Sequence, residues 1–421
     1  MPIRKRSDRP EVLVAGAGAS GCIAAICLAR RGLHVTLVDK NKEPARKIRV
    51  TGNGRCNLTN LFQDRTCWYS ESGPAFMEPL GQFGAGELMA FFEDMGVRFH
   101  DRQGYVYPRT DQASAVADTL ISQISTLPVT FLGETAVKDI SRRKREGEKP
   151  FLVQAGDKKL SADYVILSCG GLAGPSFGCS GDGYALAGSL GHRVIKTAPA
   201  LSPLPGDRKR LKSAAGVRCR AAVCALVEGK EIRREEGEMQ FTESTLSGIP
   251  VFQISRILTR ALSEGKHCSL KADFLPELEG EALEKEASFR MGMDDSLTLQ
   301  EVFSGLVHPG LLRMILSDLG LQSEVKKRKV SPEKMGEILR ALKDCRFPVE
   351  KSGGFAKAQV TAGGVPLDEI DLHTFESRIV PGLYLTGEIL DVDGICGGYN
   401  LQWAMTGGYL AARSITERTD L

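Results

Sequence analysis

The stretch from Glu11 to Lys40, EVLVAGAGASGCIAAICLARRGLHVTLVDK, constrains the fold of this chain more than any other. It opens with a short apolar run typical of a buried parallel strand. Gly16, Gly18 and Gly21 follow in a G-x-G-x-x-G pattern, and a helical segment, a second apolar run and Asp39 complete the unit. This order predicts a strand, a tight glycine turn, a helix and a second strand, which is an arrangement that binds dinucleotides.

Each residue of the turn has a physical role in binding a pyrophosphate. Gly16 permits the tight turn, Gly18 has no side chain to keep phosphate from the backbone, and Gly21 lets the helix lie against the strand. Ala19 and Ser20 begin the helix, whose free N–H groups and positive dipole end favour an anion. We therefore predict that these five residues belong to the cofactor-binding site.

Asp39 and Lys40 end the second strand, and both are predicted to contact the cofactor. The Asp39 carboxylate stands near the spacing at which an acid accepts the ribose hydroxyls of an adenosine, which argues against a 2′-phosphate there. The motif alone does not separate FAD from NAD. Its place near the start of the sequence favours FAD.

The composition excludes several classes of protein. At 421 residues the chain is long enough for two domains or more, and a net charge of +3 does not demand an acidic partner. Eleven cysteines without a C-x-x-C pair or a secretory pattern favour reduced thiols and a cytoplasmic location. No apolar run approaches a membrane span, and the six histidines have no ligand spacing, so we expect neither membrane insertion nor a metal site.

The loop that follows, KNKEPARKIRVTGNGRCNLTN at residues 40–60, is basic and rich in Gly, Asn and Thr. Two interpretations are open: a solvated basic loop, or a cradle for the rest of a flavin dinucleotide. In the second, glycines admit the ligand, basic side chains neutralise phosphate and short polar side chains add contacts. The residues expected to contact the cofactor are Lys47, Gly54, Arg55, Cys56 and Asn57.

Four blocks of the sequence resemble a known family. Residues 47–60 with TGNGRCNLTN, 170–192, 237–256 and 359–409 are similar to the BaiN/YhiN-like flavoproteins, also called the aminoacetone-oxidase-like FAD-binding family. These proteins are FAD-dependent, NAD(P)-linked oxidoreductases. The resemblance implies an α/β fold: a Rossmann-like FAD-binding domain of the glutathione-reductase type, with an inserted β-barrel-like plus helical domain.

The resemblance also implies FAD contacts in later segments. A main-chain amide near Val137 would meet the adenine, although this residue is nearly as well explained as a core residue. A glycine pair would approach the cofactor after a buried strand, with Cys169 as a small packing residue. The last helix would direct its N-terminus at the flavin ring, and an acid would hold the ribityl or phosphate. The residues are Cys169, Gly170, Gly171, Gly387, Glu388, Asp393, Asn400 and Leu401.

Composition changes near Lys196, where APALSPLPGD is a proline-rich connection, and family motifs return near Lys357. Between them we expect strands at 220–227, 239–242 and 269–274, and a helix capped by Ser331. The sequence thus predicts an FAD-binding domain formed by residues 1–195 and 351–421. Residues 196–350 form the inserted domain.

Other elements follow from local patterns. We expect helices at 87–95 and 113–125, strands at 129–132, 163–168 and 383–386, and an exposed turn at Arg142–Gly147. The basic clusters Arg142–Arg145, Arg208–Lys212 and Lys326–Lys329 have no aromatic neighbours in sequence, so RNA binding is not favoured. Nothing in the sequence indicates an oligomeric state.

The resemblance implies two reaction types on a small-molecule substrate. One is reduction of a conjugated C=C bond in a 3-oxo steroid or bile acid, with NADH or NADPH as hydride donor. The other is oxidation of an amino-ketone such as aminoacetone by O₂. We prefer the reductase, because a site for a small amine has no obvious carboxylate pair beyond Glu388 and Asp391. A non-catalytic flavin- or RNA-binding module is the third alternative.

A reductase must also supply a proton. The candidate donors near the last glycine motif are Tyr399, Cys396 and water. Tyr399 is the preferred side chain because a helix N-terminus stabilises a phenolate. The alternative interpretation is that Tyr399 only packs against the ring or the motif.

Overall fold

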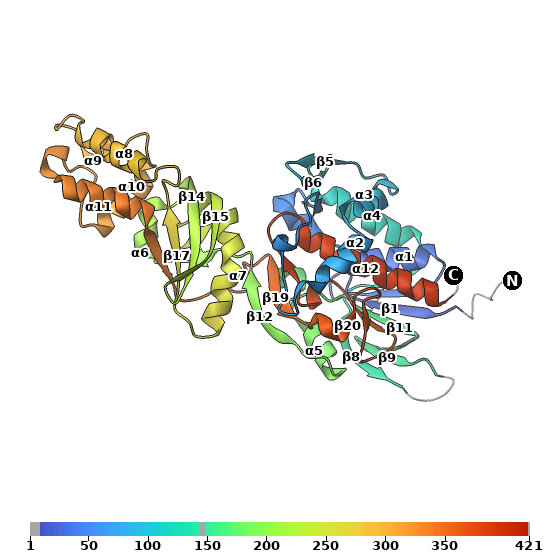
Figure 1. Cartoon of the computed structure of the whole chain (residues 1–421). Coiled ribbons are helices and arrows are strands. Elements are labelled where there is room, and N and C mark those ends of the chain that lie inside the picture. Colours follow the sequence, from blue (N-terminus) through green and yellow to red (C-terminus); the bar gives the residue numbers. More distant parts are fainter. Residues whose placement is uncertain (1–8, 144–147, 420–421) are drawn as a thin grey trace. The chain divides into compact units, whose positions relative to one another are not determined.

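The computed structural model describes residues 9–143 and 148–419 (Figure 1). The chain divides into two compact units, one formed up to Thr197 and again from Val360 onward, the other by Ala198–Gln359. Each unit has its own hydrophobic core. The second unit is therefore inserted, in sequence, between two segments of the first.

The first unit is built on a seven-stranded sheet with the order β20-β21-β22-β11-β1-β2-β7. The strands from β22 to β7 run parallel, while β20 and β21 pair antiparallel. Strand β1 is central, and its residues Val12–Ala15 are buried because other elements cover both faces. The strands are β1 Glu11–Ala15, β2 His34–Val38, β7 Val129–Leu132, β11 Tyr164–Leu167, β20 Ile370–Asp371, β21 Glu376–Ser377 and β22 Leu383–Leu385.

Helices α1 (Ala19–Arg30) and α12 (Tyr399–Arg418) pack closely side by side (Figure 1). Glycine makes this approach possible, since a Cβ on Gly408 would lie 2.2 Å from the main-chain oxygen of Ser20. Helix α4 adjoins α1, where Arg30 Nη2 donates to Gln123 Oε1 at 2.8 Å. The other helices of this unit are α2 Met77–Gln82, α3 Ala85–Glu93, α4 Ala113–Thr126 and α5 Asp182–Ser189.

Four smaller sheets complete the strand pairing around the first unit. The sheet β3-β6-β5 carries residues that lie beside the start of α12. The strands are β3 Thr59–Asn60, β4 Trp68–Tyr69, β5 Phe99–Arg102, β6 Tyr105–Pro108, β8 Val137–Arg142, β9 Phe151–Ala155, β10 Lys158–Ala162, β12 Ile195–Ala200, β19 Val360–Gly364 and β23 Asp393–Gly394.

The second unit contains a six-stranded antiparallel sheet with the order β13-β16-β15-β14-β17-β18. Helix α7 buries Val251, Ile254 and Leu258 in the core of this unit. The strands are β13 Leu204–Pro205, β14 Arg218–Val227, β15 Lys230–Phe241, β16 Thr245–Ser247, β17 Cys268–Asp273 and β18 Cys345–Val349. The helices are α6 Arg208–Leu211, α7 Ile249–Ser263, α8 Glu281–Met291, α9 Leu299–Val302, α10 Pro309–Asp318 and α11 Pro332–Lys343.

Most local expectations are confirmed within a few residues, including the predicted helices that correspond to α3, α4 and α11. Ser331 caps α11, its hydroxyl accepting from the Lys334 N–H at 3.3 Å. The main difference is β15, which begins at Lys230 rather than 239. Its first residues are mostly charged and exposed, so no apolar alternation marks them. Pairing along β14 holds the strand instead.

The return to the first unit occurs at residue 360, later than the 351 expected. Contacts within the second unit explain the difference. A Cβ on Gly353 would lie 2.6 Å from the Pro203 carbonyl oxygen, and the Gln359 N–H donates to the Leu201 carbonyl at 3.3 Å. The expected turn at Arg142–Gly147 lies partly outside the described residues.

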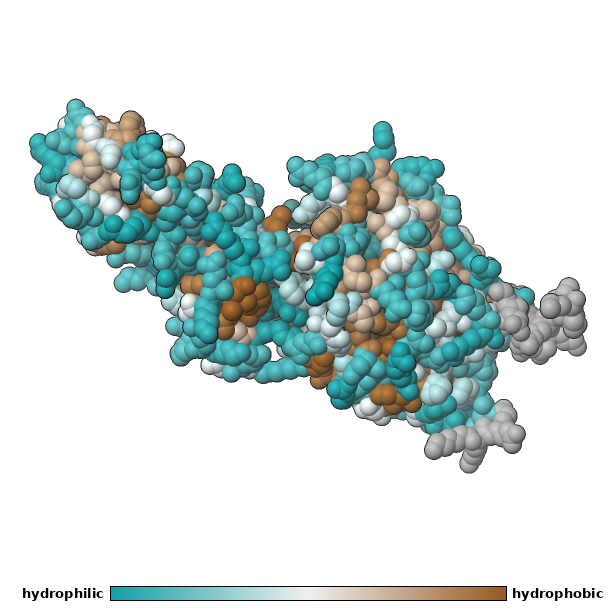
Figure 2. All heavy atoms as spheres, viewed as in Figure 1, coloured by the Kyte–Doolittle hydropathy of each residue, from teal (hydrophilic) through white to brown (hydrophobic). Residues whose placement is uncertain are grey.

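The surface in Figure 2 is mainly hydrophilic, with hydrophobic side chains gathered in separate small patches. Among the large apolar side chains that are more than half exposed are Leu61 at 53%, Phe62 at 62% and Phe289 at 64%. Among the described helices, none has the length and apolar character needed to cross a membrane. Residues 9–143 and 148–419 also contain no group of three His, Cys, Asp or Glu side chains arranged to hold a metal ion.

Candidate functional site

Many of the residues predicted to contact a cofactor lie in the segments that follow β22, β11, β1 and β2. These strands are neighbours in the sheet and run parallel, so the segments that follow them meet at one edge. Ligands bind at this edge in open α/β sheets. The four segments begin after Leu385, Leu167, Ala15 and Val38.

The glycine turn after β1 is packed tightly on one side and open on the other. Gly16 has φ +102°, and a Cβ there would lie 2.4 Å from the Ser168 carbonyl oxygen. A Cβ on Gly21 would lie 1.9 Å from the Gly16 carbonyl oxygen. In contrast, within the described residues no atom beyond the chain neighbours lies within 4 Å of a Cβ on Gly18. The turn therefore presents bare backbone to open space at Gly18.

The N-terminus of α1 points from this turn without a side-chain cap. Gly18 is the N-cap residue, and the first turn contains no acidic residue. Uncapped N–H groups at a helix start, together with the helix dipole, form a site for an anion such as a phosphate. Ala19 and Ser20 lie in this first turn, where the Ser20 hydroxyl donates to Thr386 Oγ1 at 2.7 Å.

Asp39 braces the glycine turn through its carboxylate. Its Oδ2 accepts from the Ala17 N–H at 2.7 Å, and its Oδ1 accepts from the Asn41 N–H at 2.7 Å and from Asn41 Nδ2 at 2.9 Å. A carboxylate has about four acceptor sites, so three bonds leave one for a ribose hydroxyl. The carbonyl of Asp39 accepts from the Thr135 N–H at 2.8 Å, which brings the segment before Val137 to the same edge.

Lys47 and Glu388 connect the loop after β2 to the loop after β22. Lys47 Nζ lies 3.0 Å from Glu388 Oε2, while Glu388 Oε1 accepts from the Thr361 N–H at 2.8 Å. Burial is the largest single influence and would lower the pKa of Lys47, but the Glu388 carboxylate and the Cys179 thiol together outweigh burial and leave this pKa raised. Lys40 forms a separate ion pair with Asp182 in the first turn of α5.

The TGNGRCN segment is partly open to solvent. Gly54 has φ +80° and, like Gly18, open space at its Cβ position among the described residues. Arg55 is exposed, and Asn57 is half-buried. Cys56 is fully buried, and burial raises the pKa of its thiol to about 12, so it packs as a small apolar residue.

The segment after β11 brings its glycines close to the same edge. Cys169 Sγ donates to the Ala15 carbonyl at 3.4 Å, and burial raises the pKa of this thiol to about 12. Gly170 has φ +71° and open space at its Cβ position among the described residues. A Cβ on Gly171 would lie 2.5 Å from Thr361 Oγ1 and 2.9 Å from Glu388 Oε1.

The start of α12 is a second uncapped helix N-terminus. Gly398 is its N-cap residue with φ +89°, no side chain caps the helix, and no acid lies in its first turn. Asn400 Oδ1 accepts from the Gly394 N–H and Asn400 Nδ2 donates to the Gly394 carbonyl, both at 2.9 Å. Leu401 is half-buried, and Asp393 is 2% exposed.

Tyr399 lies inside the packing of this motif. Its side chain is 3% exposed, and its ring stands edge-on to Trp68 with centroids 5.3 Å apart. Burial raises the pKa of Tyr399, and the neighbouring Cys67 thiol adds to the rise. The geometry therefore matches the packing interpretation better than a proton donor facing a substrate.

Three further residues join this edge that pattern reasoning did not single out. Thr361 Oγ1 accepts from the N–H groups of Leu172 at 2.8 Å and Ala173 at 3.0 Å, which fixes the glycine segment after β11. Ser168 Oγ donates to main-chain oxygens of β1 and its turn, and Thr386 accepts from Ser20. In the sequence, the one signal for these three residues is their position next to a predicted strand end or a glycine pair.

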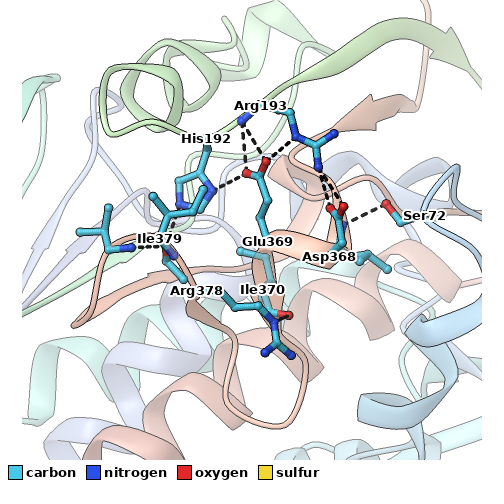
Figure 3. Close-up of polar contacts among 11 residues, drawn as sticks. Ser72, His192, Arg193, Asp368, Glu369, Ile370, Arg378 and Ile379 are labelled. Carbon is cyan, nitrogen blue, oxygen red and sulfur yellow. Dashed lines mark hydrogen bonds and ion pairs between the residues drawn. The ribbon is translucent and has the colours of Figure 1, made fainter.

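A second polar cluster contains His192, Glu369 and Arg193 (Figure 3). His192 Nδ1 is 2.8 Å from Glu369 Oε2, and His192 Nε2 is 2.8 Å from Ser377 Oγ. Ser377 Oγ also accepts from the N–H groups of Ile379 and Val380 at 3.1 and 2.8 Å. Both lone pairs of the hydroxyl are thus used, so its proton goes to His192 Nε2 and Nδ1–H donates to Glu369.

The hydrogen bonds run from Ser377 to His192 to Glu369, as in a Ser–His–Glu catalytic triad. Unlike a catalytic triad, these side chains are not accessible to a substrate. The His192 side chain is 0% exposed, and the Ser377 oxygen is saturated by main-chain donors. Arg193 Nε donates to the remaining Glu369 oxygen at 2.7 Å. The cluster therefore ties the chain before β12 to the segment around β20 and β21 as a structural brace.

Comparisons with known proteins identify relatives of the whole chain. Residues 10–414 match the family described as HI0933-like protein Rossmann domain. A 3-dehydro-bile acid delta(4,6)-reductase of Clostridium scindens is 40% identical over 407 residues, which is 96% of this chain and 98% of that protein. Ribosomal RNA dihydrouridine synthases of Escherichia coli and Haemophilus influenzae are each 28% identical, covering 97% and 98% of this chain and 98% and 100% of theirs.

Proposed function

Because the chain belongs to the HI0933-like Rossmann-domain family, we propose that it is an FAD-dependent reductase of a C=C bond conjugated to a 3-oxo group in a steroid or bile acid. One observation carries this proposal, namely the similarity to the bile-acid reductase along almost the full length of both chains. An FAD-dependent oxidoreductase also agrees with the N-termini of α1 and α12, which have neither a side-chain cap nor an acid in the first turn.

The residues present fit FAD. Gly18 and Gly170 leave open space where a Cβ would otherwise stand, and the start of α1 has N–H groups available for the pyrophosphate. Asp39 retains an acceptor site for a ribose hydroxyl, as counted above. The start of α12 would face the flavin ring, whose anionic reduced form a helix dipole stabilises. When bound, FAD would supply the hydride that the reaction needs.

The remaining predicted FAD contacts belong to the same proposal. They lie in the glycine turn and the start of α1, in the loops after β2 and β11, at the start of β8, and between Gly387 and the start of α12. The residues are Gly16, Ala19, Ser20, Gly21, Lys40, Lys47, Gly54, Arg55, Cys56, Asn57, Val137, Cys169, Gly171, Gly387, Glu388, Asp393, Asn400 and Leu401.

We further propose NADH or NADPH as the source of the hydride. Residues 196–350 contain no second dinucleotide motif, so the nicotinamide would bind transiently as a co-substrate. The cytoplasmic location predicted from the sequence is part of the same proposal. The eleven cysteines are free thiols, in keeping with a reducing compartment and its nicotinamide pool.

A second candidate function is reduction of a uracil C=C bond in ribosomal RNA, favoured by the two dihydrouridine synthases among the relatives. The chemistry is of the same class, because that bond is also conjugated to a carbonyl. The basic clusters of the second unit support it less. Arg210 is paired with Asp318 at 2.8 Å and lies over the Phe347 ring, and Lys327 is paired with Asp295 at 2.7 Å.

A product assay tests both candidates. The FAD-loaded protein is incubated with NADH or NADPH and either androstenedione, which is a 3-oxo steroid with a conjugated C=C bond, or ribosomal RNA. Mass spectrometry of the steroid and of nucleosides from digested RNA then detects addition of two hydrogens. We expect reduction of the steroid. Reduction of uridine alone would favour the second candidate, and oxygen-dependent turnover of aminoacetone would favour the oxidase.

A further inference from the structure

Reduction of a conjugated C=C bond places a hydride on the β-carbon and a proton on the α-carbon. The proton must come from a group that reaches the substrate. Such a group has to lie beside the start of α12, where the flavin ring is proposed to bind, and has to be partly open to solvent. Tyr399 meets the first requirement but not the second, because it is 3% exposed and packed against Trp68.

Tyr105 meets both requirements. It lies on β6 and is half-buried, and a Cβ on Gly397 would come within 2.9 Å of its Cε1 atom. Gly397 directly precedes the N-cap residue of α12. The strand β3 fixes this contact, because Asn60 is paired with Tyr105 and Asn60 Nδ2 donates to the Gly397 carbonyl at 3.3 Å.

The alternation of β6 directs Tyr105 outward. Val106 and Pro108 are buried, whereas Tyr105 and Tyr107 share the other face of the strand. Tyr107 packs beside β5, where its ring is 6.0 Å from that of His100. The two tyrosines thus lie on the same face of one strand and are both half-buried, but of the two only Tyr105 lies beside Gly397.

Two exposed apolar residues follow Asn60, the residue that pairs with Tyr105 between β3 and β6. Leu61 and Phe62, at 53% and 62% exposure, follow Asn60 directly at the end of β3. The Leu61 N–H donates to the Gly104 carbonyl at 2.8 Å, and the Phe62 N–H donates to Asn60 Oδ1 at 2.9 Å. The first bond joins Leu61 to the residue before Tyr105, and the second fixes the turn that places Phe62 after β3. Exposed apolar groups of this kind commonly mark a surface that binds an apolar partner.

We infer that Tyr105 donates the proton to the α-carbon of the reduced substrate, and that Leu61 and Phe62 contact its hydrocarbon rings. This inference rests on the proposed function. The Oη–H bond of Tyr105 breaks as the new C–H bond forms at the α-carbon. The electron pair for this bond comes from the enolate produced by hydride addition at the β-carbon, and solvent then returns a proton to the phenolate.

The test compares Tyr105→Phe with Tyr107→Phe and Tyr399→Phe in the FAD-loaded protein. Each protein is reduced anaerobically with dithionite and mixed with androstenedione, and reoxidation of the flavin is followed by absorbance. Tyr105→Phe should slow reoxidation by about 10²–10⁴-fold, the usual effect of a positioned acid. Tyr107→Phe should react at the wild-type rate, and slowing by Tyr399→Phe without slowing by Tyr105→Phe would assign the proton to Tyr399 and overturn the inference.

Binding gives a readout independent of turnover. The affinity of androstenedione for the oxidised protein is measured by calorimetry for wild type, Phe62→Ser and Phe289→Ser. Phe62→Ser removes an apolar surface that the bound steroid would cover. This loss is worth about 1–2 kcal/mol, so binding should weaken by about 5–30-fold. Phe289 is equally exposed but lies in the second unit, so its substitution should have no effect. Both residues are surface residues, so folding should be retained.

Three outcomes are distinguishable. Wild-type reoxidation that is slowed by Tyr105→Phe and steroid binding weakened by Phe62→Ser would support the inference. Reoxidation and binding unchanged in both variants would overturn the inference and leave the proposed function intact. Failure of wild-type protein to be reoxidised by the steroid would overturn the proposed function, and the inference with it.

Discussion

Lys47 Nζ lies 3.0 Å from Glu388 Oε2, and this ion pair joins residues 341 positions apart in the sequence. Both side chains are mostly buried, at 28% and 20% exposure. Removing one partner leaves the other charge poorly solvated. We expect Lys47→Met to lower the free energy of unfolding by about 1–3 kcal/mol, below the cost found for fully buried pairs. Urea denaturation of the FAD-free protein measures this change.

The matched control is Arg49→Met. Arg49 pairs with Asp118 at 2.6 Å, but these side chains are 36% and 61% exposed, so we expect a loss of about 1 kcal/mol or less. The raised pKa of Lys47 sets the pH dependence. Its contribution is fully present below the pKa of unfolded lysine and is lost only as pH rises through the higher folded value. The loss of unfolding free energy in Lys47→Met should therefore be equal at pH 7 and pH 9. A loss that is present at pH 7 and absent at pH 9 would contradict this account.

Substitutions at Gly18 and Gly21 distinguish an effect on cofactor binding from an effect on folding. A Cβ on Gly18 meets open space and its φ is −76°, so Gly18→Val should leave the thermal unfolding of the FAD-free protein nearly unchanged. The valine would occupy the proposed pyrophosphate position. Loss of two charged hydrogen bonds, about 3–6 kcal/mol, would weaken FAD binding by about 10²–10⁴-fold. Fluorescence titration with FAD measures the affinity.

Gly21→Val gives the contrasting result. Its Cβ would lie 1.9 Å from the Gly16 carbonyl oxygen, so this variant should lose stability as well as FAD. Normal FAD affinity in Gly18→Val would remove the glycine turn from the proposed cofactor site.

The brace in Figure 3 gives a prediction about stability alone. Ser377→Ala removes the acceptor of the Val380 N–H and the donor to His192 Nε2. Leaving such buried groups unsatisfied should cost about 1–3 kcal/mol, measured by urea denaturation. FAD affinity and steroid reduction should not change. Loss of an ester-hydrolysing activity in this variant would instead indicate that Ser377 is a nucleophile.

The local part of the site could be predicted because its residues are consecutive. The sequence from Gly16 to Asp39 carries its strand, turn, helix and acid in one stretch, and the structure has these elements in that order. Helix α11 was predictable for the same reason, since its cap and apolar stripe lie within about three turns.

The long-range part could not be derived from such patterns. No local rule links Lys47 with Glu388, or Thr361 with the glycines after β11. Tyr105 stands beside Gly397 only because β3 and β6 pair in one register, which neither segment specifies alone. For Tyr399 the local pattern suggested a role that the contacts do not favour. Its position in a glycine motif suggested a proton donor, whereas its contacts with Trp68 and Gly394 bury it.

The most direct test of the central claim is the absorption spectrum of the purified protein under anaerobic conditions. The protein should contain FAD, and addition of NADH or NADPH should bleach the flavin band. Subsequent addition of androstenedione should restore that band while one equivalent of reduced steroid forms. A colourless protein that does not bind added FAD, or a reduced flavin that the steroid leaves bleached but O₂ rapidly reoxidises, would contradict the account.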